Sequence, residues 1–251
     1  MTKYSTAPQH AVSNRVRNTP VTHLGQVAKS KPRYTSGELT TAALSVAVER
    51  FANIARKGGD TPYLSHLLAV SALVMEHGGS EEQAAAALLH DIIEDCDVSG
   101  VQLVELLVAR GADQAAAERV TRMVEATTDG QASDRRNKTD WLRRKQTYLD
   151  GLANKSPSHP ALLVSLADKV HNAEATLAQV RSGQSANDIY AGVEFNAKAA
   201  DQRWYYTNLA AVFGTQLSSD VNAQPLVRRL AAAVEEIFRD VADTSQPVEG
   251  Q

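Results

Sequence analysis

The chain has 251 residues, of which 43% are hydrophobic, 22% are charged and 5% are aromatic, the composition of a globular protein. Its formal net charge of −3 argues against a general nucleic-acid-binding protein and against a membrane-surface protein. Its single cysteine, Cys96, excludes an internal disulfide framework and a cysteine-rich zinc site. The sequence has neither an apolar run near the ~20 residues that span a bilayer nor the apolar stretch of a secretory signal, so we expect a cytoplasmic protein.

Alanine-rich segments such as residues 84–87 and 231–233 predict an all-α fold, because alanine favours helices and is a poor strand former. Residues 1–34 are polar and interrupted by prolines, and we expect a flexible arm there. We expect a single helical bundle over residues 35–215, followed by a helix and a short tail over residues 216–251.

Helix boundaries follow from capping residues and turns. Thr35 and Glu38 have the spacing of a capping box and predict a helix through about residue 57; a turn follows at residues 58–62. Gly78 and Gly79 should end a helix around residues 67–74, and Ser80 with Gln83 should begin the next. That helix and the later ones are predicted over residues 81–95, 100–110, 113–126, 140–153, 161–181, 188–213 and 225–240.

Three apolar helical segments contain ionisable residues that a helix alone does not need. They are His66 in the second helix, the group His90, Asp91, Glu94 and Asp95 in the third, and Asp168 in mid-helix after the apolar run 161–167. Each alone has an ordinary interpretation as a surface residue or a satisfied core residue. Together they are costly to bury unless they pair or bind a metal ion. Imidazole and carboxylate ligands suit Mn²⁺, Fe²⁺, Co²⁺ or Zn²⁺ better than Ca²⁺.

The spacing within the third helix separates possible ligands from possible catalysts. Glu94 lies four residues after His90, and Asp95 lies four residues after Asp91. On a regular helix both carboxylates would project from the ligand side, one turn further along. We expect them there to orient or deprotonate an attacking water.

Basic residues flank these segments, and about half of them have a sufficient explanation as solvated surface. In a chain of net charge −3, their position beside the predicted metal site indicates a substrate with several phosphates. They are Arg56, Lys57, Arg135, Arg136, Lys138, Arg143, Arg144 and Lys145.

The pattern of His66, the His90–Asp91 pair and Asp168 resembles the signature of the HD-domain metal-dependent phosphohydrolases. Wider motifs extend the match: Arg56-Lys57 with Tyr63 before His66, Leu89 to Asp95, and Leu166 to Asn172. This set resembles the hydrolase domain of the RelA/SpoT family, in particular the stand-alone small alarmone hydrolases, over roughly residues 35–213. Two departures are His66-Leu67, where the family commonly has His-Pro, and Cys96, where it often has Thr.

The resemblance implies an all-α fold, one Mn²⁺ per chain and removal of the 3′-pyrophosphate from (p)ppGpp. It implies that His66, His90, Asp91 and Asp168 bind the metal and that Glu94 and Asp95 activate water. Substrate contacts would come from Arg56, Lys57, Asn172 and the basic residues Arg143, Arg144 and Lys145. His171 falls at a variable position of the third motif, and we expect it either behind the ligands or facing solvent.

Other functions stay open at this point. The chain could be an HD phosphohydrolase for another nucleotide, such as a dNTP, NADPH or a cyclic dinucleotide, or a non-catalytic nucleotide- or protein-binding module. Only about 38 residues follow residue 213, so we expect a chain that degrades the alarmone and does not make it. Such a chain could also serve as an antitoxin that neutralises a toxic alarmone synthetase.

Overall fold

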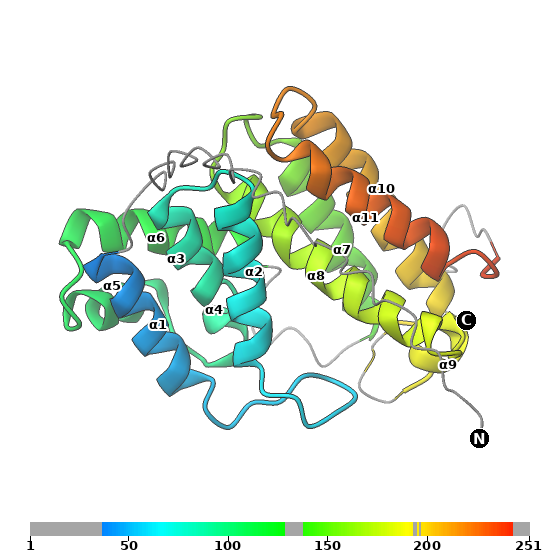
Figure 1. The fold of residues 1–251 in the computed structure, drawn as a ribbon, viewed down its shortest axis with the longest axis horizontal. Helices are drawn as coiled ribbons and strands as arrows, with labels where there is room; N and C mark the ends of the chain where they lie inside the picture. Colours follow the sequence, from blue (N-terminus) through cyan, green and yellow to red (C-terminus); the bar gives the residue numbers. More distant parts are fainter. Residues whose placement is uncertain (1–36, 129–137, 193–194, 196, 243–251) are drawn as a thin grey trace, which may run out of the picture. The chain divides into compact units, whose positions relative to one another are not determined.

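A computed structural model describes residues 37–128, 138–192, 195 and 197–242 (Figure 1). The predicted flexible arm and the loop at residues 129–137 lie outside these residues. The described part is helical, with one isolated antiparallel bridge between Ala55 and Pro62, which confirms the all-α prediction. Its helices are α1 (Glu38–Arg50), α2 (Leu64–Glu76), α3 (Glu81–Leu89), α4 (Ile92–Asp95), α5 (Gly100–Val108), α6 (Gln114–Thr127), α7 (Lys138–Ala153), α8 (Ala161–Arg181), α9 (Ala186–Ile189), α10 (Ala199–Gln216) and α11 (Gln224–Ile237).

The long helix α8 lies between two groups of helices (Figure 1). It packs against α2, α3 and α6 on one side and against α11 on another. Every residue from Ala161 to Asp168 is buried, as expected of a helix that is covered all round. Asp168 is therefore the first charged side chain of α8, and it stands in the core.

Helix α3 allows close packing because its residues 84–87 are alanines that are completely buried. These small side chains lie among α1, α2, α6 and α8. The capping box of Ser80 and Gln83 begins α3 as predicted. The preceding helix ends as predicted at Gly78, whose φ of 86° suits glycine, and the Gly79 amide donates to the Val74 carbonyl at 2.9 Å.

Helix α11 belongs to the same core as the preceding helices, since Leu226, Leu230 and Ile237 are buried where it packs on α8 and α10. Two ion pairs also join α8 to α11, Glu174 with Arg229 at 2.8 Å and Arg181 with Glu236 at 2.7 Å.

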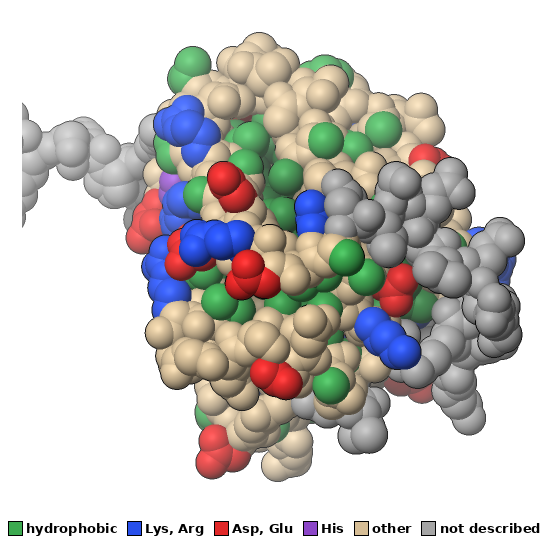
Figure 2. All heavy atoms as spheres, turned by 90° about the vertical axis from the view of Figure 1, so that its right-hand side faces the viewer, with side chains coloured by type: hydrophobic (Ala, Val, Ile, Leu, Met, Phe, Trp, Pro, Cys, Tyr) green, Lys and Arg blue, Asp and Glu red, His purple; other side chains and the backbone are tan. Residues whose placement is uncertain are grey.

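On the face drawn in Figure 2, basic side chains lie next to acidic ones, with hydrophobic side chains scattered among them. Among the described helices, none is both long enough and apolar enough to cross a membrane.

Three predicted helices are interrupted. The first begins at Glu38 and ends at Arg50, and residues 54–63 instead fold back on themselves. Arg56 N donates to Thr61 O at 2.9 Å and Tyr63 N donates to Ile54 O at 2.8 Å, which uses backbone groups that a continued helix would need. Arg56 and Lys57 therefore lie on a loop and not on a helix.

The predicted helix over residues 81–95 breaks between α3 and α4. Asp91 has φ −99° and ψ 2°, in the sparsely populated region between helix and strand. The helix predicted over residues 188–213 is likewise divided into α9 and α10. Asp201 caps α10 by accepting a hydrogen bond from Lys198 N at 3.2 Å, and Tyr190 and Phe195 pack edge-to-face between the two helices.

Helix α1 receives its N-terminal cap from a residue that is distant in sequence. Oε1 of Glu81, in the first turn of α3, accepts hydrogen bonds from Gly37 N at 2.7 Å, Thr40 N at 3.3 Å and the Thr40 hydroxyl at 2.8 Å. Partial burial raises the pKa of Glu81, but these hydrogen bonds outweigh it and lower the pKa below its ordinary value. The stabilisation is therefore complete above the ordinary pKa and is lost as pH falls through the lower folded value.

We predict that Glu81→Ala lowers the free energy of unfolding by about 1 kcal/mol at pH 7, the usual contribution of a helix cap. The exposed Glu105 on α5 gives a control, Glu105→Ala, which should have little effect. Urea unfolding at pH 7 and in acid would measure both. An effect of Glu81→Ala that persists undiminished after the carboxyl group is protonated would contradict the capping role.

Candidate functional site

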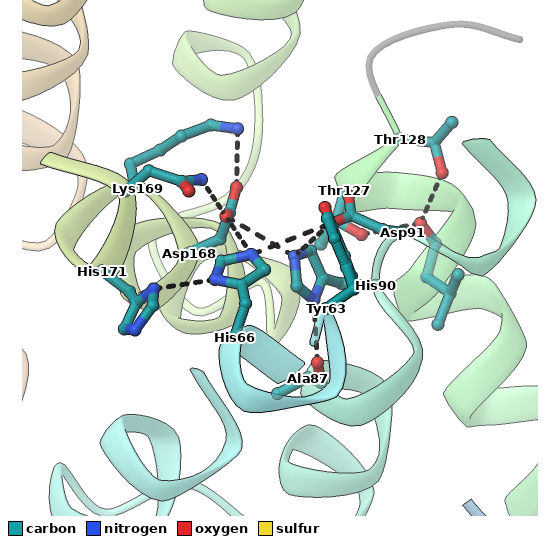
Figure 3. Close-up of polar contacts among 12 residues, drawn as sticks. Tyr63, His66, Ala87, His90, Asp91, Thr127, Thr128, Asp168, Lys169 and His171 are labelled. Atoms are coloured by element: carbon teal, nitrogen blue, oxygen red, sulfur yellow. Dashed lines mark hydrogen bonds and ion pairs between the residues drawn. The ribbon is translucent and has the colours of Figure 1, made fainter. Parts of the chain in front are cut away.

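Four side chains from α2, α8 and the bend between α3 and α4 converge at one point (Figure 3). The Nε2 atom of His66 lies 3.2 Å from Oδ1 of Asp168 and 3.8 Å from Oδ2 of Asp91. The Nε2 atom of His90 lies 3.5 Å from that Asp168 oxygen and 2.9 Å from that Asp91 oxygen. The structure thus brings together the four residues that the sequence predicted as metal ligands.

Both imidazole rings are buried, with exposed fractions of 1% for His66 and 3% for His90. Their Nε2 atoms have no hydrogen-bond partner among the described residues, although each faces a carboxylate. Leaving a buried polar atom unsatisfied costs about 1–3 kcal/mol. His66, His90 and Asp168 offer ligand atoms that all lie within 4.8 Å of one another. These residues fit a divalent metal ion that accepts mixed nitrogen and oxygen ligands.

The tautomer of His90 follows from its backbone contact. Its Nδ1 atom lies 2.8 Å from the carbonyl oxygen of Ala87 (Figure 3). A carbonyl oxygen only accepts, so Nδ1 carries the proton and donates it. In the neutral ring the lone pair of Nε2 therefore points towards the carboxylates, as a metal ligand requires.

Two neighbours on α8 donate hydrogen bonds to Asp168, and a residue of the loop before α2 supports one of them. Lys169 Nζ donates to Oδ2 of Asp168 at 2.7 Å, and Asn172 Nδ2 donates to Oδ1 at 2.6 Å. Arg56 Nη2 in turn donates to Oδ1 of Asn172 at 2.9 Å. The predicted substrate residues Arg56 and Asn172 thus form a hydrogen-bonded chain that ends on a predicted ligand.

Tyr63 holds Asp91 in a similar way. Its hydroxyl group donates to Oδ2 of Asp91 at 2.6 Å, and its ring stacks on Phe51 with 5.3 Å between centroids. Burial and the negative charge of Asp91 raise the pKa of Tyr63. The phenol therefore stays protonated and remains a donor.

Mutual charge interactions set the ionisation of the cluster in the absence of metal. Burial lowers the pKa of His90, but the negative charges of Asp91 and Asp168 raise it well above its ordinary value. Burial raises the pKa of Asp168, but the adjacent Lys169 ammonium and the histidines lower it well below its usual range. The pKa of Asp91 is also lowered, because the charge of His90 outweighs burial.

The cluster lies at the wall of a cavity of about 650 Å³, a typical size for a ligand site. Glu94 and Asp95, the predicted catalytic carboxylates, line this cavity beside Asp91. Burial and the charge of Asp91 raise the pKa of Asp95 to about 6. The sequence prediction assumed one continuous helix through Asp95. The helix instead breaks between α3 and α4, so these carboxylates follow the ligands on a separate short helix.

Basic side chains reach the cavity from three elements: Arg56 and Lys57 from the loop, Arg144 and Lys145 from α7, and Lys169 from α8. Lys145 Nζ also lies 4.7 Å from the centre of the Tyr205 ring. Arg143, predicted with its two neighbours, is exposed and does not line the cavity.

The cavity continues along one face of α8. Asp168, Asn172, Thr176 and Gln179 all line it. At 1.5 Å per residue, the eleven positions from Asp168 to Gln179 correspond to about 16 Å along the helix axis. Tyr190, Phe195 and Tyr206 also line the cavity, and the hydroxyl groups of Tyr190 and Thr176 lie 3.4 Å apart.

Sequence reasoning missed several of these residues. Tyr63 and Lys169 stand within the recognised motifs, and their adjacency to ligands was the available signal. Tyr190 and Phe195 gave no such signal, because an aromatic residue in a predicted helix more often indicates core packing. His171, expected behind the ligands or in solvent, is half-buried with its Nδ1 atom 2.8 Å from Nδ1 of His66.

Comparison with known proteins agrees with the sequence motifs. A family model described as HD domain matches residues 43–198. A Synechocystis protein named probable guanosine-3′,5′-bis(diphosphate) 3′-pyrophosphohydrolase is 30% identical over 162 residues, which are 61% of this chain and 19% of that protein. The human protein named guanosine-3′,5′-bis(diphosphate) 3′-pyrophosphohydrolase MESH1 is 33% identical over 114 residues, 45% of this chain and 54% of that protein. The matched segments thus span between a fifth and about half of these relatives.

A solved structure of a metazoan SpoT ortholog, described as hydrolysing ppGpp, has a similar fold. It aligns with a TM-score of 0.53 and 23% sequence identity, covering 82% of this chain and 96% of that one. The likeness concerns the arrangement of helices and agrees with the predicted HD-domain bundle.

We predict that Lys169→Met destabilises the metal-free protein by about 3 kcal/mol, because it removes the cation that neutralises the buried Asp168 carboxylate. Lys155→Met provides a control, since the ammonium group of Lys155 donates to the backbone carbonyl oxygen of Gly151 at 3.4 Å and forms no ion pair within the described residues. Denaturant unfolding in a chelating buffer would measure both variants. A loss of under about 1 kcal/mol for Lys169→Met, the size of an exposed ion pair, would contradict this interpretation.

Proposed function

We propose that this chain, which belongs to the HD-domain family, is a divalent-metal-dependent hydrolase that removes the 3′-pyrophosphate of (p)ppGpp-type nucleotides. The products would be pyrophosphate and GDP or GTP. The observation that carries the proposal is the convergence of two unsatisfied imidazole nitrogens with two carboxylates at the wall of a nucleotide-sized, cation-lined cavity. The names of the relatives point to the same reaction.

We assign the metal to His66, His90, Asp91 and Asp168, with Mn²⁺ as the ion and one ion per chain. A bound divalent ion supplies Lewis-acid chemistry, which makes water more acidic and polarises phosphoryl oxygens. The hydrogen bonds to Ala87, Tyr63 and Lys169 keep the ligand atoms in place. Restricting the ligands in this way favours a preformed site.

The two carboxylates after the bend, Glu94 and Asp95, would activate the attacking water. Asp95 would accept the proton of the attacking water, and Glu94 would orient that water towards the phosphorus atom. Both line the cavity beside Asp91, so neither has to displace a proposed ligand in order to act. A positioned general base of this kind contributes about 10²–10⁴-fold to rate.

The remaining lining residues would bind a substrate longer than pyrophosphate. The cavity follows α8 for about 16 Å from Asp168 to Gln179, which exceeds the length of a pyrophosphate and suits a nucleotide. Arg56, Lys57, Arg144 and Lys145 would neutralise the phosphate groups. The aromatic side chains at the α9–α10 end offer stacking surfaces for a base.

We place this activity in the cytoplasm, where its nucleotide substrates are found. The same reaction would let the chain act as an antitoxin against a toxic alarmone synthetase, by destroying the synthetase product. Co-expression with such a synthetase would test that role: growth should recover with the wild-type chain and fail to recover with His90→Ala.

Product analysis tests the reaction directly. We predict that purified protein with Mn²⁺ converts ppGpp to GDP and pyrophosphate, and that a chelator or His90→Ala abolishes this conversion. A panel should include an adenosine 3′-pyrophosphate, dNTPs and NADPH. Release of single phosphates, or turnover of a dNTP or NADPH with none of ppGpp, would contradict the proposed substrate and place the chain among other HD phosphohydrolases.

The carboxylate roles predict a separate kinetic pattern. Glu94→Gln and Asp95→Asn keep the shape of each side chain and remove its charge and basicity. Each should lower kcat by about 10²–10⁴-fold while metal content changes little, because neither residue is a proposed ligand. Single-turnover kinetics combined with elemental analysis would measure both quantities. Wild-type kcat in both variants would remove the two carboxylates from the mechanism.

A further inference from the structure

His66 is held on α2, yet both of its ring nitrogens meet side chains of α8. Its Nε2 atom lies 3.2 Å from Oδ1 of Asp168, and its Nδ1 atom lies 2.8 Å from Nδ1 of His171. Asp168 and His171 are three residues apart, so they project from the same face of α8. Figure 3 shows the His66 ring between the His171 ring on one side and the carboxylates on the other.

The 2.8 Å contact between two imidazole nitrogens needs one donor and one acceptor. Two tautomer pairs satisfy it: either His66 donates from Nδ1 to His171, or His171 donates from Nδ1 to His66. In the second case the neutral His66 ring carries its proton on Nε2, which faces Asp168. In the first case Nε2 of His66 keeps its lone pair on the side where His90 and Asp168 converge.

We infer that His171 is a positioning residue for the metal site: its Nδ1 atom accepts the Nδ1 proton of His66 and so keeps Nε2 of His66 unprotonated and oriented for the ion. This inference rests on the proposed metal site. His171 does this for His66 as the backbone carbonyl oxygen of Ala87 does for His90. The two ligand imidazoles are thus fixed by different kinds of acceptor, one from the main chain and one from a side chain.

Because His66 is buried, this contact is the main determinant of which nitrogen of its ring carries the proton. His66 is 1% exposed, so water has little access to compete for Nδ1. The ring also packs edge-to-face against Tyr63 and His90, with centroids 5.5 Å and 5.1 Å away. These ring contacts restrict rotation but do not select a tautomer, whereas an acceptor at Nδ1 does.

Two substitutions of nearly equal size separate hydrogen bonding from packing. In His171→Asn, the amide oxygen is bonded to Cγ, as Nδ1 is in histidine, so an acceptor remains at the same place. His171→Leu puts a methyl group there and removes the acceptor. Leucine has the higher helix propensity, so a purely structural role on α8 would favour His171→Leu.

We predict the opposite order for metal binding. Removing such a supporting group typically weakens metal affinity by about 10–100-fold, so His171→Leu should raise the Kd for Mn²⁺ by that factor. His171→Asn should stay within about threefold of the wild-type Kd, because its acceptor is retained. Calorimetric titration of the chelator-treated full chain with Mn²⁺ measures the Kd. Thermal unfolding of the same metal-free samples measures stability, with Ala178→Leu and Ala178→Asn on the exposed side of α8 as controls for helix propensity.

Proton positions provide a direct second measurement. In the Zn²⁺-loaded protein, long-range ¹⁵N–¹H correlations should place the proton of His66 on Nδ1 and that of His171 on Nε2. Equal Mn²⁺ affinity of wild type and His171→Leu, or a proton on Nδ1 of His171, would overturn this inference and leave the metal site intact. A wild-type chain that binds neither Mn²⁺ nor Zn²⁺ would overturn the metal site and this inference together.

Discussion

The burial of ionisable groups at one point of the core is the constraint on which the site depends. His66, His90 and Asp168 are almost completely inaccessible, and groups of this kind are costly to bury without partners. In the metal-free protein, Lys169 and the proton favoured on His90 supply positive charge next to the two carboxylates. In the neutral rings, the Nε2 atoms of His66 and His90 have no hydrogen-bond donor among the described residues, so the protein side chains leave the cluster incompletely satisfied. A divalent cation would satisfy these atoms and the carboxylates at once.

Helix α8 couples this cluster to the rest of the cavity. Every residue of its first half up to Asp168 is buried, and the helix packs against α2, α3 and α11, which makes Asp168 a rigid reference point. Its second half carries Asn172, Thr176 and Gln179 along the cavity on the same face. Regular helical spacing would therefore set how far a substrate group bound near Gln179 lies from the proposed metal ligands. Because α11 packs along α8, the C-terminal helix contributes to that rigidity although it lies outside residues 43–198 of the family match.

Much of the fold followed from the sequence, because long apolar periods, glycine ends and the Ser80 capping box act locally. The four predicted ligands were recognisable because charged residues interrupt otherwise apolar helices. The three errors in helix continuity share a location: residues 54–57, the bend at His90 and Asp91, and Tyr190 with Phe195 between α9 and α10 all contribute to the cavity wall. Local propensity permits a helix at each place, and tertiary contacts override it there. Functional sites are where local and global preferences are expected to disagree. The capping of α1 by Glu81 could not be predicted from local sequence either, because the hydrogen bond joins residues 44 positions apart.

The charge distribution of the cavity explains why metal and substrate should depend on each other. The metal end presents the carboxylates of Asp91, Glu94, Asp95 and Asp168, which repel phosphate groups when they are ionised. Among the described residues, five basic side chains line the cavity, and Lys169 is paired with Asp168. A polyphosphate could reach the end near Asp91 only when a cation there reverses the sign of the local potential. Any coupling free energy of this kind is reciprocal, so a bound polyphosphate would tighten metal binding by the same factor by which the metal tightens substrate binding. The proposed acidic ligands and the basic lining are therefore complementary: the carboxylates attract a metal cation, the basic side chains attract phosphate groups, and the cation would let those phosphates approach the carboxylates.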